Sequence, residues 1–77
     1  KGEAADFEIY GLSNAVLCKW IADNVDFDQM ILEFHNPDEP NSGWIHCSYK
    51  NEDNRKQILR AYKNDSGKTC YEDYDPQ

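Results

Sequence analysis

The chain opens with an alternation of apolar and polar positions. Ala5, Phe7 and Ile9 alternate with acidic or small residues, and a glycine interrupts the pattern, so we predict a strand over residues 4–10. In such a strand Asp6 points away from the face that carries Phe7 and Ile9. Taken alone, Asp6 is most simply interpreted as a solvated strand residue.

The pattern then changes from alternation to helical spacing. Ser13 is a favoured N-cap residue, and apolar side chains recur at intervals of three and four after it. These features predict a helix over residues 13–24. We expect its apolar stripe to pack on the sheet, with Trp20 as part of the core.

The next apolar run, residues 27–34, predicts a strand with both faces covered. Glu33 stands inside it, where a carboxylate is costly to bury without a partner. A nearby histidine or a metal would be such a partner, and the alternative is a strand-end glutamate that reaches solvent. His35 follows, and we expect it in the loop or behind a site rather than as a ligand.

Residues 36–42 are rich in proline, asparagine and aspartate and predict a wide hairpin loop. The strand predicted after it, residues 43–48, has Trp44, His46 and Ser48 on one face. An antiparallel hairpin of this kind can bring Glu33 beside His46. An imidazole held on a strand is well placed to bind a metal or to move a proton.

The rest of the chain is less clearly patterned. Residues 57–63 suit a helix or a strand, but the turn residues 64–67 favour a terminal hairpin with a return strand over residues 69–71. Residues 72–77 are acidic, and we expect a flexible tail. The resulting fold class is α+β, a small antiparallel sheet with one main helix on one face and a metal site on the other.

Length, net charge and cysteine content limit the kinds of partner and site that this chain can have. Seventy-seven residues form a single small domain, and the net charge of −7 argues against partners such as nucleic acid or an anionic membrane surface. Three widely spaced cysteines with no Cys-x-x-Cys pair are interpreted as reduced thiols, two of them buried, rather than as zinc ligands.

Several motifs together resemble the zinc D-Ala-D-Ala carboxypeptidase family, in particular its phage and bacterial branch. Gly2, Ala4 and Asp6 match the Gly-x-Ala-x-Asp motif of that family. A helix with a tryptophan and an apolar strand follow, and then Gly-Trp-Ile-His-Cys-Ser, in which His46 matches the last zinc ligand. Order and spacing agree along roughly the first 50 residues.

The resemblance implies a Hedgehog/DD-peptidase-like fold of which this chain is the C-terminal part, incomplete at its N-terminus. It implies Zn²⁺ held by Asp6 and His46 together with a histidine from an upstream segment of the same protein. We assign the general base to Glu33, and substrate contacts to Trp44 and Ser48. The implied reaction is hydrolysis of peptidoglycan peptides, of the D,D-carboxypeptidase or L-Ala-D-Glu endopeptidase type.

The implied setting is a protein, bacterial or phage-encoded as in endolysins, that is made in the bacterial cytoplasm and acts at the cell wall. As this piece alone we expect it to be inactive. The alternative is a non-catalytic binding or structural module, such as a phage tail or wall-binding protein with a degenerate site. A third reading is an unrelated interaction domain in which Asp6 and His46 are only structural.

Overall fold

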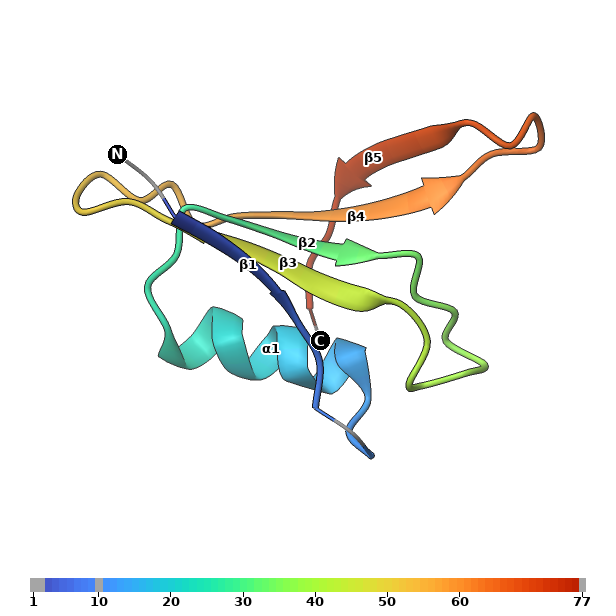
Figure 1. The fold of residues 1–77 in the computed structure, drawn as a ribbon, viewed down its shortest axis with the longest axis horizontal. Coiled ribbons are helices and arrows are strands. Elements are labelled where there is room, and N and C mark those ends of the chain that lie inside the picture. The colour runs from blue at the N-terminus through green and yellow to red at the C-terminus, as the bar shows by residue number, and fades with distance from the viewer. Residues whose placement is uncertain (1–2, 10, 77) are drawn as a thin grey trace.

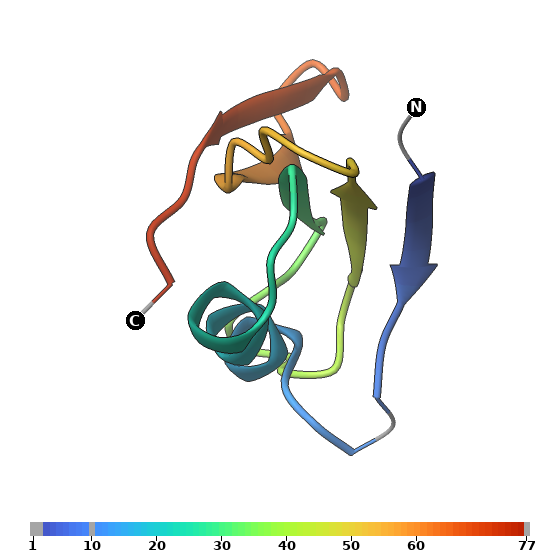
Figure 2. The same ribbon diagram turned by 90° about the vertical axis from the view of Figure 1, so that its left-hand side faces the viewer.

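The computed structural model describes residues 3–9 and 11–76 and contains one helix packed on a five-stranded sheet (Figure 1). The elements follow the order β1 (Glu3–Phe7), α1 (Asn14–Asn24), β2 (Gln29–Glu33), β3 (Trp44–Tyr49), β4 (Gln57–Lys63) and β5 (Thr69–Asp73). The expected α+β class with one main helix is confirmed. The chain turns away from the sheet after β1, forms α1, and returns as β2 (Figure 2).

The sheet is mixed, so the expectation of an antiparallel sheet is wrong in one respect. The strand order is β1-β3-β2-β4-β5, and every neighbouring pair is antiparallel except β2 and β4, which are parallel. The reason is the connection over residues 50–56. It leads from the end of β3 to the far side of β2, and this second reversal makes β4 run in the same direction as β2.

The sequence of α1 explains how it begins. The Ser13 hydroxyl accepts hydrogen bonds from the backbone N–H groups of Ala15 and Val16, as a favoured N-cap residue does. One face of the helix is buried against β2 and β3, and the core there consists of Leu17, Cys18, Ile21, Phe27, Met30, Leu32 and Ile45. The predicted helix and its cap are therefore confirmed.

The prediction that Trp20 belongs to the core is wrong. Its side chain is 57% exposed, and Val16, one turn earlier, is also exposed. A helix turns by about 100° per residue, so a face centred on Leu17 and Ile21 leaves the ridge one position earlier outside the contact with the sheet.

The second strand is covered on one face only, contrary to expectation. Met30 and Leu32 are buried under α1, whereas Gln29, Ile31 and Glu33 are half-buried on the opposite side. We call this side of the sheet, opposite α1, the open face. The strand ends at Glu33, and the next residue, Phe34, has a φ of 55°, in the left-handed region.

The C-terminal residues form the hairpin that the turn signal favoured. Asn64 closes the turn, because its carbonyl accepts from the Gly67 N–H and its side chain from the Ser66 and Lys68 N–H groups. The expected flexible tail is wrong for residues 72–74. Glu72 and Asp73 belong to β5, and Tyr74 donates its N–H to the Ile58 carbonyl and packs against the core. Gln77 lies outside the described residues.

A carboxylate that the sequence analysis did not single out anchors the start of β2. Asp28 is buried, and it accepts hydrogen bonds from the Arg55 backbone N–H at 3.1 Å, from Nε at 2.9 Å and from Nη2 at 2.8 Å. The hydrogen bonds from Arg55 hold the pKa of the Asp28 carboxyl well below its ordinary value, against the opposing effect of burial. The pair fixes the connection that leads into β4.

Two of the three cysteines were expected to be buried, but only Cys18 is, while Cys47 and Cys70 are half-buried. Burial and, to a lesser degree, the neighbouring Cys47 raise the pKa of Cys18 to about 11, and burial also raises the pKa of Cys47. Both groups are therefore neutral thiols near pH 7, the form that neither attacks nor binds metal well. Within the part of the chain that the structure covers, no helix is long and apolar enough to cross a membrane.

Candidate metal centre

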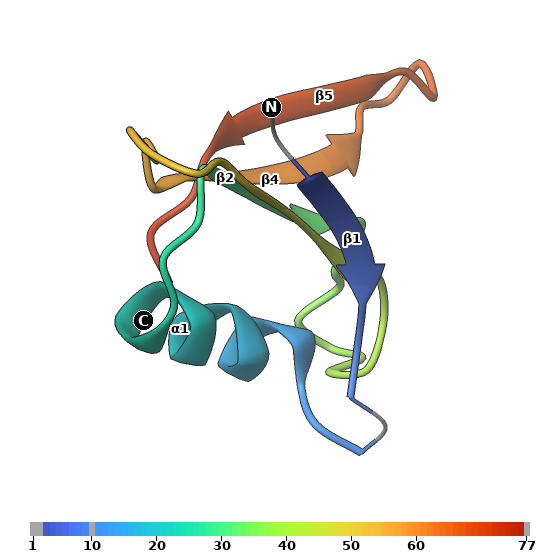
Figure 3. The ribbon, with the colours of Figure 1, turned by 60° about the vertical axis from the view of Figure 1, so that its left-hand side comes forward.

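Strand register places three ionisable side chains on the open face. Asp6 of β1 pairs with His46 of β3, and His46 pairs on its other side with Ile31 of β2. Residues paired across strands share a face, and so do residues two apart on one strand. Asp6, His46 and Glu33 therefore come from three adjacent strands and face away from α1. Figure 3 shows β1 at the edge of the sheet and α1 on one side of it.

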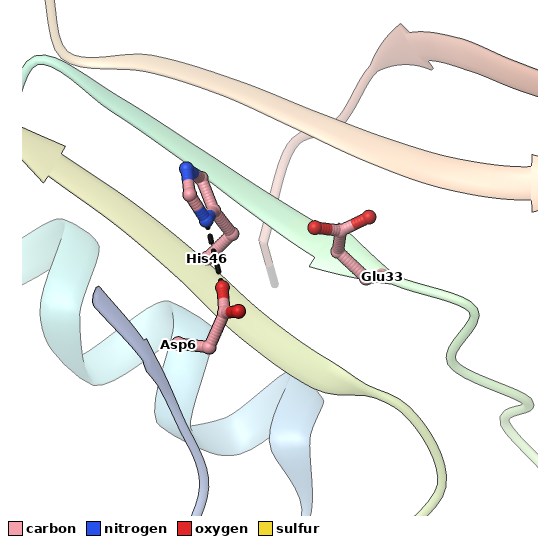
Figure 4. Close-up of side chains that lie close together, drawn as sticks. All are labelled: Asp6, Glu33 and His46. Atoms are coloured by element: carbon pink, nitrogen blue, oxygen red, sulfur yellow. Dashed lines mark hydrogen bonds and ion pairs between the residues drawn. The ribbon is translucent and has the colours of Figure 1, made fainter. Parts of the chain in front are cut away.

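These side chains lie within reach of one another, and we call them the carboxylate–imidazole cluster. The Asp6 Oδ1 and His46 Nδ1 atoms are 2.7 Å apart, and one ligand atom from each of the three residues lies within 4.8 Å of the others (Figure 4). Asp6 is exposed, and Glu33 and His46 are half-buried. In the described part of the chain, no hydrogen bond or ion pair engages the Glu33 carboxylate.

The donor set fits zinc chemically. Zinc takes nitrogen from histidine and oxygen from carboxylates at about 2.0–2.2 Å, which places two ligands of a tetrahedral ion about 3.4 Å apart. The 2.7 Å between Asp6 Oδ1 and His46 Nδ1 and the 4.8 Å limit on the separations within the cluster bracket that value. Exposed acidic groups gather without a metal in many proteins, and the cluster by itself does not establish one.

Two aromatic rings and a cation border the cluster at the end of β2. Trp44 pairs with Glu33 across the strands, and its ring lies 5.7 Å from that of Phe34 at an angle of 55°. The Lys63 Nζ atom lies 5.7 Å from the centre of the Phe34 ring. This border presents apolar surface next to Glu33 and a positive charge next to Phe34.

The structure does not bring the other sequence candidates into the cluster. The Ser48 hydroxyl is engaged with the Gln29 backbone, accepting from its N–H at 3.1 Å and donating to its carbonyl at 3.4 Å. His35 lies in the loop, as expected, with Nδ1 3.2 Å from the Ser42 carbonyl oxygen. A role for Ser48 in substrate binding stays a prediction.

Two residues that sequence reasoning missed fix the entry of β3. Gly43 has a φ of 73°, and a Cβ atom there would lie 2.1 Å from the Glu33 carbonyl oxygen. Asn14, at the start of α1, donates through Nδ2 to the carbonyls of Ser42 at 2.9 Å and Gly43 at 3.1 Å. The glycine beside Trp44 was a visible signal of a tight approach, whereas the contact made by Asn14 spans 29 residues and had no local signal.

The chain was compared with models of known protein families, with curated proteins and with solved structures. None of the three comparisons finds a match. A functional assignment therefore depends on the motifs and on the geometry of the open face.

Proposed function

We propose that the chain is the C-terminal part of a zinc-dependent peptidase that acts on peptidoglycan peptides, with Asp6 and His46 as zinc ligands. The observation that supports this most is the carboxylate–imidazole cluster itself. Asp6 and His46 were selected by motif spacing and are 40 positions apart, and the Asp6 Oδ1 and His46 Nδ1 atoms lie 2.7 Å apart on an accessible sheet face. In this proposal the third ligand is the histidine that the resemblance implies in an upstream segment of the same protein.

In this proposal, zinc when bound supplies Lewis-acid activation of a water molecule and of the scissile carbonyl. Glu33 accepts the proton of the attacking water and returns it to the leaving amine. Its carboxylate suits that role because no other described residue holds it. Trp44 and Phe34 offer the peptide an apolar surface, and the Lys63 ammonium offers a partner to a carboxylate on the substrate.

Zinc titration by calorimetry tests the ligand assignment on the 77-residue chain. We expect His46→Ala and Asp6→Ala each to weaken zinc binding by about tenfold to a hundredfold, since each removes one ligand from an incomplete set. His35→Ala is the matched histidine control, and Asp65→Ala, in the exposed turn before β5, is the matched aspartate control. Equal zinc affinity in His46→Ala and His35→Ala would contradict the assignment.

A second substitution separates a base from a ligand. If Glu33 is the base, Glu33→Gln leaves zinc affinity within about twofold, and it abolishes hydrolysis of wall peptides by a protein that carries the upstream residues. If Glu33 is instead a third ligand, Glu33→Gln lowers zinc affinity as much as Asp6→Ala does. The exposed Glu52, changed to glutamine, serves as the control for the loss of one negative charge.

A non-catalytic module is the second candidate, and one observation favours it. The Asp6 carboxylate and the His46 imidazole already satisfy each other at 2.7 Å, as a structural cross-strand pair does. In that case the 77-residue chain takes up zinc no better than the His46→Ala variant. Asp6→Ala then changes only stability, by about 1 kcal/mol or less, because the pair is largely exposed.

A further inference from the structure

An apolar groove lies on the helix side of the molecule, away from the carboxylate–imidazole cluster. Its exposed large side chains are Ile9, Val16, Trp20, Val25 and Tyr49. Beneath them are a cavity of about 570 Å³ and one of about 320 Å³, both lined by Ile9, Leu17 and Trp20. These apolar side chains gather around the hollows instead of standing singly on the surface, which is the arrangement that an interaction site offers.

The groove is the consequence of how α1 sits on the sheet. Leu17 and Ile21 face the core, so Val16 and Trp20, spaced by four residues, form an outward ridge. From the sheet side, Ile9, after β1, lines both hollows, and Tyr49, at the end of β3, lines the larger one. The two walls thus come from separate elements, as in grooves that accept an amphipathic segment.

The charged residues around the groove indicate which kind of partner it would bind. The charged side chains that line the groove and the hollow adjoining it at Ile9 are both acidic, Asp26 in the larger cavity and Glu8 in the adjoining one. The basic residue of α1, Lys19, is neutralised by Asp23, whose carboxylate lies 2.8 Å from its Nζ atom. A second copy of this chain, with its net charge of −7, would bring like charges together.

We propose that the groove binds an amphipathic polypeptide segment whose large apolar side chains are flanked by lysine or arginine. The apolar side chains fill the hollows between α1 and the sheet, with Trp20 as the main contact. The basic side chains face Glu8 and Asp26 at the rim.

Calorimetric titration with two synthetic helical peptides tests this. The first peptide is built of leucine and lysine, and the second has the same pattern with glutamate in place of lysine. We expect the leucine–lysine peptide to bind at least about tenfold more tightly, and its binding to weaken as salt is added. Comparable binding of the two peptides would overturn the proposal.

Substitutions localise the binding. Trp20 of α1 is 57% exposed, and Tyr71 of β5 is 56% exposed. The substitutions Trp20→Ala and Tyr71→Ala therefore each remove one aromatic ring of similar exposure. We expect Trp20→Ala to weaken binding of the leucine–lysine peptide about tenfold or more, and Tyr71→Ala to change it less than about twofold. Val16→Ala, on the same ridge, should weaken it in the same direction.

Two results count against the inference. Equal losses in Trp20→Ala and Tyr71→Ala would mean attraction to the acidic surface at large. A dimer in sedimentation that Trp20→Ala dissociates would mean that a second copy occupies the groove instead. Neither readout involves zinc, so the inference stands or falls independently of the proposed peptidase.

Discussion

At the residue scale, the most constrained ionisable group is Asp28 rather than a member of the cluster. Glu33 ends β2 and Asp28 directly precedes it, but of these two carboxylates only that of Asp28 is buried. Its burial depends on Arg55, which is 27 residues away. Local patterns detect a misplaced charge, but they do not detect the distant partner that neutralises it.

Asp28 should dominate the response of stability to acid. Its pKa is lowered in the folded state, so its contribution is fully present above the unfolded pKa of about 3.9 and is lost as pH falls below that value toward the folded pKa. We expect Asp28→Asn to destabilise the protein at pH 7 and to have a shallower loss of stability between about pH 4 and pH 2. The free energy of unfolding of both proteins, measured in urea at pH 7 and between about pH 4 and pH 2, tests this prediction.

The control for that comparison is Asp38→Asn, in the exposed loop before β3. It removes one carboxylate without touching Arg55, so its acid response should parallel that of the unmodified chain. Parallel acid responses of Asp28→Asn and the unmodified chain would mean that the ion pair contributes nothing to folding.

At the element scale, prediction succeeded where a pattern is local. The helix with its Ser13 cap, the strand that carries His46 and the terminal hairpin were all predicted from spacing and turn residues. The outward ridge of α1 was not, because helical spacing fixes the apolar stripe but not the angle at which it meets the sheet. Trp20 was therefore assigned to the core, although the sheet covers only one side of that stripe.

Gly43, directly before β3, lies so close to the Glu33 backbone that a larger residue there should destabilise the fold. Gly43→Ala would bring a Cβ atom to 2.1 Å from the Glu33 carbonyl oxygen at a φ of 73°. We expect a loss of about 3 kcal/mol in the free energy of unfolding, measured in urea, because both the strain and the clash fall on backbone atoms.

Gly67→Ala is the matched control for Gly43→Ala. Gly67 also has a positive φ, of 77°, but nothing lies within 4 Å of a Cβ atom placed there. The expected loss is therefore only the cost of the left-handed conformation, about 1–2 kcal/mol. Equal losses in the two variants would show that the hairpin loop relaxes freely around residue 43.

At the scale of the whole molecule, the fold class and the placement of the helix and the candidate cluster on opposite faces of the sheet could be predicted from the sequence. The strand order could not. Nothing in residues 50–56 indicates that the chain passes to the far side of β2, and the parallel pairing of β2 with β4 follows from that passage alone. For the candidate site, Asp6, Glu33 and His46 could be named from the sequence, and the hairpin of β2 and β3 could be expected to bring Glu33 beside His46. The approach of Asp6 could not, because it depends on the long-range pairing of β1 with β3.

Asp6 is carried by β1, which lies at one edge of the sheet and pairs with β3 only. An edge strand opens more easily than a central one, and a metal held by both Asp6 and His46 would have to dissociate before β1 separates from β3. Zinc at about 100 times its dissociation constant should then slow amide hydrogen exchange in β1 by up to roughly a hundredfold. Exchange in β5, the opposite edge, should not change, so the two edges report whether ligand binding and local unfolding are one equilibrium.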